Sequence, residues 1–213
     1  MPSPKTYLIT GANRGKIFHL RILHKYFQDS SRRSGLGRGL LEALVQRPNT
    51  VVIAGVRNLT HSTCESLKAV PTGAGSKVIA VVIRSTDERS AKEAVAALQS
   101  EHGISKIDTV IANAGISNYY GSADITPIIE VRDHFEINAV GTLLLFQATW
   151  PLLKLSSNPI FMALSTGVAS IGAMGGIPLQ ATAYGMSKIA VNYMVQKIHF
   201  ENPKLTAFVM SPG

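Results

Sequence analysis

The sequence contains a single cysteine, Cys64, among its 213 residues. An internal disulfide is therefore excluded, which fits a reducing compartment. No apolar run reaches the roughly 18 residues that a membrane span requires. The N-terminal stretch MPSPKTYLIT also lacks the charged and then apolar pattern of a signal peptide. We therefore expect a cytoplasmic protein without a membrane partner, in which Cys64 is an inert small residue.

Acidic residues are scarce, with 13 Asp and Glu against 21 Lys and Arg, which gives a net charge of +8. Such a charge can indicate an anionic partner. Half of the excess, however, lies in the segment Lys16–Gly35, which holds five basic residues and one acidic residue. The remainder is spread along the chain, so we expect no nucleic-acid partner. The length and the 46% hydrophobic content indicate one globular domain with a sizeable core.

Outside that segment, short apolar runs alternate with helical patterns. The expected strands are Thr6–Thr10, Thr50–Val56, Lys77–Ile83, Asp108–Asn113, Ile160–Leu164 and Leu205–Met210. The expected helices are Arg38–Gln46, Thr60–Lys68, Ser90–His102, Pro127–Leu155 and Ala183–Asn202. Continuous apolar strands are typical of a parallel sheet that is covered on both faces. The pattern predicts an α/β fold, a Rossmann-like doubly wound parallel sheet that binds ligands beyond the carboxyl ends of its strands.

The first expected strand ends in TGANRG, which looks like half of a phosphate-binding turn. Removal of Lys16–Gly35 gives TGANRGLGRGL, which matches the pattern T-G-x-x-x-G-x-G. Glycines allow such a turn to approach a pyrophosphate closely, and the following helix offers free N–H groups. Either Gly15 or Gly35 could be the second glycine of this motif.

The twenty-residue insert, residues 16–35, has three competing explanations. It could be a basic amphipathic element that binds a membrane surface or an acidic partner. It could be a tolerated surface loop, since loop-closure entropy grows slowly with length. It could also be a translated intron, because Gly-Lys can be encoded by a splice-donor sequence and removal restores the motif without a gap. We favour the intron hypothesis.

Two arginines indicate the type of nucleotide. In this fold, an acid after the second strand binds the ribose 2′-hydroxyl, whereas an arginine accepts a 2′-phosphate. The stretch AGVRN has no acid, so Arg57 and Arg14 favour NADP(H). The alternative is two solvated surface arginines. The stretch IANAG, residues 111–115, ends a strand with small residues that permit close approach of a cofactor.

Tyr184 and Lys188 lie four residues apart in AYGMSK and therefore share a helix face. A lysine ammonium near a phenol lowers the pKa of the phenol. We therefore expect Tyr184 to act as a general acid toward a carbonyl oxygen near neutral pH.

These stretches occur together, in order, with EINAVGT, LST…S and the closing SPG, and they resemble the short-chain dehydrogenase/reductase family over nearly the whole chain. The stretches LLFQAT, TAYGMSK and KIHFEN are similar to fungal polyketide ketoreductases of the norsolorinic acid ketoreductase type. The resemblance implies NADP(H)-dependent reduction of a small-molecule carbonyl substrate, expected to be an aromatic polyketide, to an alcohol. The rival hypothesis is a non-catalytic Rossmann-fold remnant or misassembled gene product with weak or no cofactor binding.

The resemblance implies that Tyr184 donates the proton, Lys188 holds the nicotinamide ribose and Asn138 holds a proton-relaying water. The family's serine position is Thr166 here, and Ser165 and Ser170 remain alternatives. Arg84 takes the position of an adenine-contacting acid. No metal ligands are assigned. The implied cofactor-binding residues are Gly11, Asn13, Arg14, Gly15, Leu36, Gly37, Arg57, Ser85, Asn113, Ala114, Gly115, Tyr184, Lys188, Pro212 and Gly213.

The resemblance also implies that family members continue past Pro212 and Gly213 into a substrate-covering segment and a final strand. We therefore expect residues 1–213 to form one dinucleotide-binding domain that is C-terminally truncated. Its last strand should expose apolar side chains at a sheet edge. We expect such a chain to be weakly stable and weakly active, with part of the family's homo-oligomer contact missing.

Overall fold

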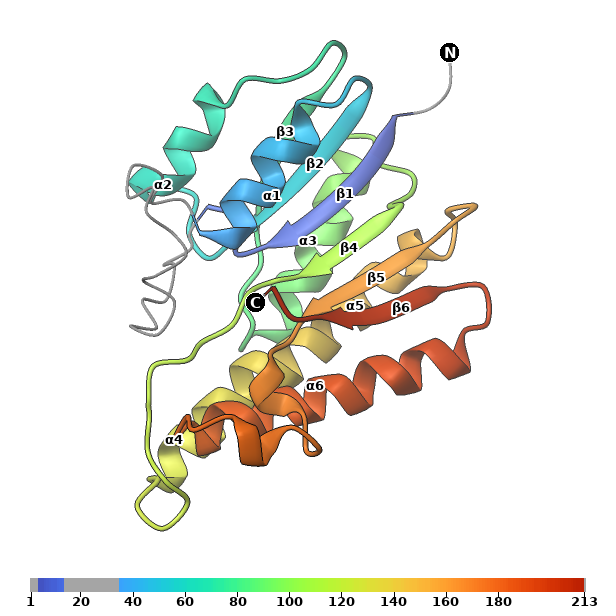
Figure 1. Cartoon of the computed structure of the whole chain (residues 1–213). Helices are drawn as coiled ribbons and strands as arrows, with labels where there is room; N and C mark the ends of the chain where they lie inside the picture. The colour runs from blue at the N-terminus through green and yellow to red at the C-terminus, as the bar shows by residue number, and fades with distance from the viewer. Residues whose placement is uncertain (1–3, 14–34, 213) are drawn as a thin grey trace.

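The computed structural model describes residues 4–13 and 35–212. Their six strands form one parallel sheet in the order β3-β2-β1-β4-β5-β6 (Figure 1). The strand order reverses between β1 and β4, as in a doubly wound sheet. The predicted fold class is therefore confirmed. The strands are β1 (Lys5–Thr10), β2 (Thr50–Val56), β3 (Lys77–Val82), β4 (Thr109–Ala112), β5 (Ile160–Leu164) and β6 (Thr206–Met210).

Helices connect these strands and cover both faces of the sheet. The α-helices are α1 (Leu36–Val45), α2 (Ser62–Glu65), α3 (Glu88–Ser100), α4 (Ile128–His134), α5 (Gly141–Leu153) and α6 (Thr182–Glu201). Shorter helical turns are η1 (Ser66–Ala69), η3 (Gly167–Ala169) and η4 (Met174–Gly176), and a π-helical turn is η2 (Phe135–Val140). Within the described part of the chain, no helix is long and apolar enough to span a membrane.

The hydrophobic core has two parts, one on each face of the sheet. Leu8 and Ile9 are adjacent in β1 and point to opposite faces, as strand geometry requires. Leu8 belongs to the cluster that includes residues of α3, α5 and α6, whereas Ile9 belongs to the cluster that includes residues of α1 and α2. Both side chains are fully buried. Covered faces explain why the strand sequences are continuous apolar runs.

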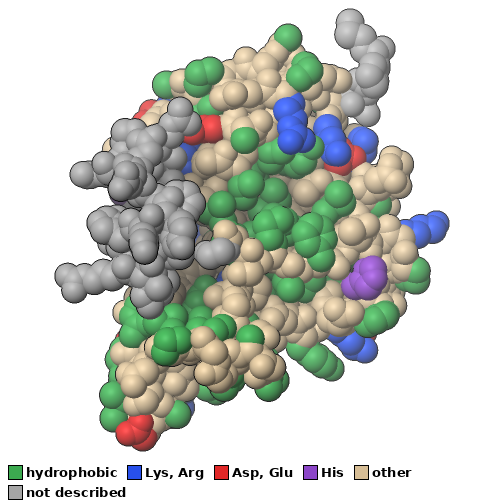
Figure 2. All heavy atoms as spheres, in the orientation of Figure 1, with side chains coloured by type: hydrophobic (Ala, Val, Ile, Leu, Met, Phe, Trp, Pro, Cys, Tyr) green, Lys and Arg blue, Asp and Glu red, His purple; other side chains and the backbone are tan. Residues whose placement is uncertain are grey.

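The described sheet ends in β6, which pairs only with β5. Phe208, Val209 and Met210 of β6 are each at least 37% exposed. Figure 2, in the orientation of Figure 1, shows hydrophobic side chains gathered near the middle of the visible face. The sheet is therefore covered less completely at this edge, in agreement with the expected exposure of apolar side chains on the last strand.

The expected helix Pro127–Leu155 differs most from the structure. It is divided into α4, the π-helical turn η2 and α5. Asn138 lies in η2, and its side chain bonds to the backbone of Ile116, 22 residues earlier. The wider π turn thus occurs together with hydrogen bonds between residues far apart in the sequence. A helical pattern of neighbouring residues does not reveal such bonds. The expected helix Thr60–Lys68 is also shorter, since it consists of α2 followed by η1.

Candidate active site

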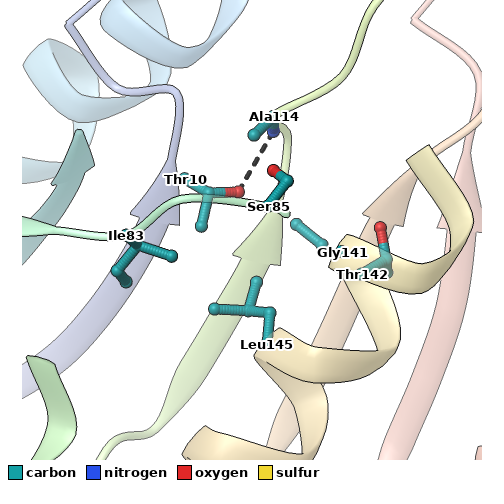
Figure 3. A pocket seen from close by; sticks show the side chains of 8 residues that line it. Thr10, Ile83, Ser85, Ala114, Gly141, Thr142 and Leu145 are labelled. Carbon is teal, nitrogen blue, oxygen red and sulfur yellow. Dashed lines mark hydrogen bonds between the residues drawn. The ribbon is translucent and has the colours of Figure 1, made fainter. Parts of the chain in front are cut away.

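The candidate site lies at the switch point of the sheet, where β1 and β4 end. The hydroxyl of Thr10, the last residue of β1, accepts hydrogen bonds from the N–H of Asn113 at 3.1 Å and of Ala114 at 3.0 Å (Figure 3). The Nδ2 atom of Asn113 donates to the carbonyl oxygen of Thr10 at 2.8 Å. These bonds fix the two strand ends beside each other. The side chain of Asn113 thus supports the turn from within the protein.

The two ends of the glycine-rich turn fit a pyrophosphate. Gly11 has a φ of +66°, a conformation that favours glycine. Gly37 lies against it, because a Cβ on Gly37 would come 2.6 Å from the carbonyl oxygen of Gly11. Helix α1 begins at Leu36 without a side-chain cap or an acidic residue in its first turn. Its first N–H groups are therefore suited to an anion. Arg14 and Gly15 lie outside the described residues, as do residues 16–34.

The nucleotide end of the site is defined by the chain after β2. The Nδ2 atom of Asn13 donates to Thr63 Oγ1 at 2.9 Å, which ties the turn to α2. Arg57 is exposed directly after β2 and makes no hydrogen bond or ion pair with another described residue. By contrast, Arg38 binds Glu42, through Nε at 2.6 Å. Within the described part of the chain, Arg57 is thus an unpaired cation at the position expected for a 2′-phosphate.

A small pocket lies between the ends of β1, β3 and β4 and the start of α5 (Figure 3). Gly141 allows α5 to approach Ser85 closely, because a Cβ on Gly141 would come 2.6 Å from the Cβ of Ser85. The structure thus brings together Ser85 and Ala114, two of the residues expected to bind the cofactor. No motif in the sequence singled out Gly141. The lining residues are Thr10, Ile83, Ser85, Ala112, Ala114, Gly141, Thr142 and Leu145.

Asn138 connects the end of β4 to helix α6. It is fully buried, and its Oδ1 atom accepts from the N–H of Ile116 at 2.7 Å. Its Nδ2 atom donates to the carbonyl oxygen of Ile116 and to Ser187 Oγ, both at 2.9 Å. Ser187 in turn donates to the carbonyl oxygen of Tyr184 at 2.7 Å. Gly115 is adjacent, since a Cβ there would come 2.8 Å from Asn138 Oδ1.

Tyr184 and Lys188 lie one turn apart on α6, with Lys188 Nζ 5.9 Å from the centroid of the Tyr184 ring. Burial lowers the pKa of Lys188 to about 8. Burial and then the phenol of Tyr120 raise the pKa of Tyr184, while a hydrogen bond with the Thr166 side chain lowers it. The expected lowering of the Tyr184 pKa is therefore wrong for this arrangement, because desolvation outweighs the lowering effect of Thr166.

The structure distinguishes the three candidate hydroxyl groups after β5. The Thr166 side chain lies close enough to the phenol of Tyr184 to lower its pKa, and its hydroxyl accepts from the N–H of Val168 at 3.3 Å. Ser165 is buried and donates to Asn192 Oδ1 on α6 at 2.6 Å, so its hydroxyl is already engaged. Ser170 is exposed after η3. Thr166 is thus the candidate whose hydroxyl contacts the expected proton donor.

Sequence reasoning missed a buried histidine beside the expected proton donor. The ring of His134 lies edge-on to that of Tyr184, with centroids 6.5 Å apart and an interplanar angle of 70°. Its Nδ1 atom lies 2.7 Å from the carbonyl oxygen of Glu130, so this nitrogen carries a proton and donates it. The Nε2 atom is buried and has no partner among the described residues.

The remaining assigned positions lie at the margins of the site. Leu36 is 42% exposed at the first position of α1. Pro212 is exposed two residues after β6. Gly213 lies outside the described residues.

Residues 31–213 match the family model described as short chain dehydrogenase. The chain belongs to the short-chain dehydrogenase family. This short-chain dehydrogenase is 41% identical over 210 residues to a norsolorinic acid ketoreductase of Emericella nidulans, which covers 97% of this chain and 71% of that protein. It is 38% identical over 216 residues to the norsolorinic acid ketoreductase of Aspergillus parasiticus, which covers 100% of this chain and 71% of that protein.

Solved structures show the same fold at lower identity. The NADPH-bound carbonyl reductase from chicken fatty liver matches this short-chain dehydrogenase with a TM-score of 0.75 and 22% identity, over 99% of this chain and 79% of that chain. The predicted family resemblance is confirmed, including its resemblance to norsolorinic acid ketoreductases. By family, the chain is an oxidoreductase with a nicotinamide cofactor. The relatives give no support to the rival hypothesis of a non-catalytic remnant.

Proposed function

We propose that this short-chain dehydrogenase is a cytoplasmic, NADP(H)-dependent ketoreductase that reduces a carbonyl of an aromatic polyketide to an alcohol. The observation that carries the proposal is the contact of Thr166 with Tyr184, one helical turn from Lys188. Two fungal relatives that are 38% and 41% identical are named norsolorinic acid ketoreductases. Their names support a ketone on an aromatic polyketide as the substrate.

The chemistry follows from the protonation state of Tyr184. When bound, the reduced cofactor supplies a hydride to the carbonyl carbon. Because its pKa is raised, Tyr184 remains protonated at neutral pH, which is the form that can donate a proton to the carbonyl oxygen. The hydroxyl of Thr166 would donate a hydrogen bond to the same oxygen. Asn138 and Ser187 would hold this part of α6 in place through their hydrogen bonds.

The residues that would hold the cofactor lie along the carboxyl edge of the sheet. The turn between Gly11 and Gly37 would hold the pyrophosphate, and the backbone at Ser85 would contact the adenine. Lys188 would hold the nicotinamide ribose. The preference for NADP(H) rests on Arg57, which is exposed after β2 and has no described partner. A guanidinium there provides the charge and donors that a 2′-phosphate requires.

Residues 16–35 would interrupt the pyrophosphate turn, and we retain the hypothesis that they are a translated intron within a single domain. A mature transcript that retains the sixty nucleotides would contradict the intron origin. We also propose a homo-oligomer, on the basis of the family alone, and size-exclusion chromatography with light scattering tests it.

The experiment that tests the proposed function is NADPH consumption with a ketone. We expect absorbance at 340 nm to fall when 1-acetonaphthone is added, and Tyr184→Phe to slow the reaction by about 10²–10⁴-fold. The variant should still bind NADPH, because the phenol hydroxyl serves the chemical step. An unchanged rate in Tyr184→Phe would contradict the assigned role. No reduction of any ketone by a folded protein that binds NADPH would contradict the proposed reaction.

A further inference from the structure

The connection between β4 and α4 is attached to the helix that carries the proposed proton donor. Gly121 forms an isolated parallel bridge with Ala181. The hydroxyl of Thr182 donates to the carbonyl oxygen of Gly121 at 3.0 Å. Tyr184 follows Thr182 by two residues, so the connection and the start of α6 are held together. The residue immediately before Gly121 is Tyr120, which the catalytic account leaves without a role.

The hydroxyl group of Tyr120 is held by a hydrogen bond, while much of the residue is exposed to solvent. The hydroxyl oxygen lies 3.1 Å from Ser117 Oγ, and Ser117 is buried. Tyr120 as a whole residue is 44% exposed to solvent. Gly121, the next residue, is bonded to Thr182, two residues before Tyr184, so the two tyrosines lie on adjoining segments; Tyr120 also contributes to the raised pKa of Tyr184. An aromatic surface is thus anchored and accessible beside the group that would protonate the substrate.

The neighbouring Tyr119 has a different environment. Its hydroxyl donates to the carbonyl oxygen of Ile125 at 3.3 Å, within the same connection. A Cβ on Gly121 would come 2.6 Å from the Tyr119 hydroxyl oxygen, so this side chain packs against the loop itself. Tyr119 therefore supports the local conformation, whereas Tyr120 is the one of the two that influences the pKa of Tyr184. The two tyrosines form a natural pair of test and control positions.

We propose that Tyr120 is a substrate-positioning residue that selects aryl ketones, in which the carbonyl carbon is attached to an aromatic ring. This inference rests on the proposed function and adds the structural element that recognises the substrate. An aromatic ring of the substrate would pack offset or edge-on against the ring of Tyr120. A tyrosine provides a rigid contact of this kind at low conformational-entropy cost. Aliphatic ketones lack the ring and gain little from this contact.

Direct binding provides a test that does not depend on turnover. The dissociation constants of 1-acetonaphthone and 2-octanone are measured by ligand-observed NMR on the full chain in the presence of NADP⁺. In Tyr120→Leu we expect weaker binding of 1-acetonaphthone by about five- to tenfold and a change of less than about twofold for 2-octanone. Tyr120→Phe, which keeps the ring, and Tyr119→Phe, the matched control, should both retain the aryl preference.

The inference is overturned if Tyr120→Leu weakens both ketones equally, or if it leaves 1-acetonaphthone binding unchanged. It is also overturned if the folded wild-type chain shows no preference for the aryl ketone. Circular dichroism checks that each variant folds, and Tyr120→Gln replaces Tyr120→Leu if the latter does not. Separate measurements test the proposed function itself: it fails if NADPH binding is not saturable or if no ketone is reduced. Reduction without aryl selectivity would contradict the role of Tyr120 alone.

Discussion

The Nζ atom of Lys188 donates a hydrogen bond to the carbonyl oxygen of Leu164 at 2.7 Å. Leu164 is the last residue of β5, so the lysine ties α6 to the carboxyl edge of the sheet. Lys188 is only 6% exposed, and this burial lowers its pKa to about 8. The protonation of Lys188 is therefore linked to the stability of the fold.

We expect the stability of the wild-type chain, relative to Lys188→Met, to rise with pH between about 8 and 10.5. In this window the unfolded chain still binds the lysine proton, whereas the folded chain has lost it. Raising the pH therefore favours the folded state, by up to about 3 kcal/mol across the window. Urea unfolding at pH 7.5 and pH 10 measures the effect. If the free energy of unfolding changes equally in the two proteins between these pH values, the lowered pKa of Lys188 is contradicted.

Asp108 should stabilise the fold at neutral pH and lose this effect in acid. Burial raises its pKa, but hydrogen bonds from Ser156, the N–H of Thr6 and Lys106 outweigh burial, so the pKa lies below the ordinary value of an aspartate. The stabilisation is therefore present above about pH 4 and disappears as pH falls through the folded-state pKa. We expect Asp108→Asn to reduce the free energy of unfolding by about 1–3 kcal/mol at pH 7 and by less at pH 3. The same loss at both pH values would contradict this assignment.

Substitution of Thr166 should identify the hydroxyl that assists Tyr184. We expect Thr166→Val, which is nearly isosteric, to lower kcat about 10²-fold, because one donor to the developing oxyanion is removed. Thr166→Ser keeps a hydroxyl and should retain most of the activity. Ser165→Ala should act mainly on stability, since its hydrogen bond goes to Asn192. If Ser165→Ala lowers kcat more than Thr166→Val does, the assignment is contradicted, and Ser165 rather than Thr166 supplies the catalytic hydroxyl.

Replacement of Arg57 should reveal the cofactor preference. Arg57→Ala is expected to raise the dissociation constant of NADPH by about 10- to 100-fold, as for loss of a charged hydrogen bond. Binding of NADH, which lacks the 2′-phosphate, should change by less than about twofold. Arg84→Ala is a comparison variant at the expected adenine position, because Arg84 is also exposed, two residues after β3, but faces Asp87 at 3.9 Å. Equal weakening of NADPH and NADH by Arg57→Ala would contradict a 2′-phosphate contact.

Local sequence was sufficient for much of the fold. The strands Thr50–Val56 and Ile160–Leu164 have the predicted bounds, because each is a continuous apolar run bounded by polar or turn residues. The spacing of Tyr184 and Lys188 likewise places both on one face of a helix. In these cases, the information lies within a few neighbouring residues.

Long-range contacts account for what the sequence did not reveal. The π-helical turn around Asn138 accompanies bonds to Ile116, and the choice between Ser165 and Thr166 depends on Asn192 and Tyr184. His134 and Tyr120 approach Tyr184 only after the chain has folded. Their residue types carry no local signal that separates them from ordinary core or loop aromatic residues.

The central claim is that the two halves of the glycine-rich turn form an NADP(H) site that residues 16–35 interrupt. The most direct test is a fluorescence titration with NADPH of the full chain and of a variant that lacks Lys16–Gly35. We predict saturable binding by the variant that is at least about tenfold tighter than that of the full chain, since an intact turn presents its N–H groups to the pyrophosphate. A folded deletion variant that binds NADPH no better than the full chain, or not at all, would contradict the account.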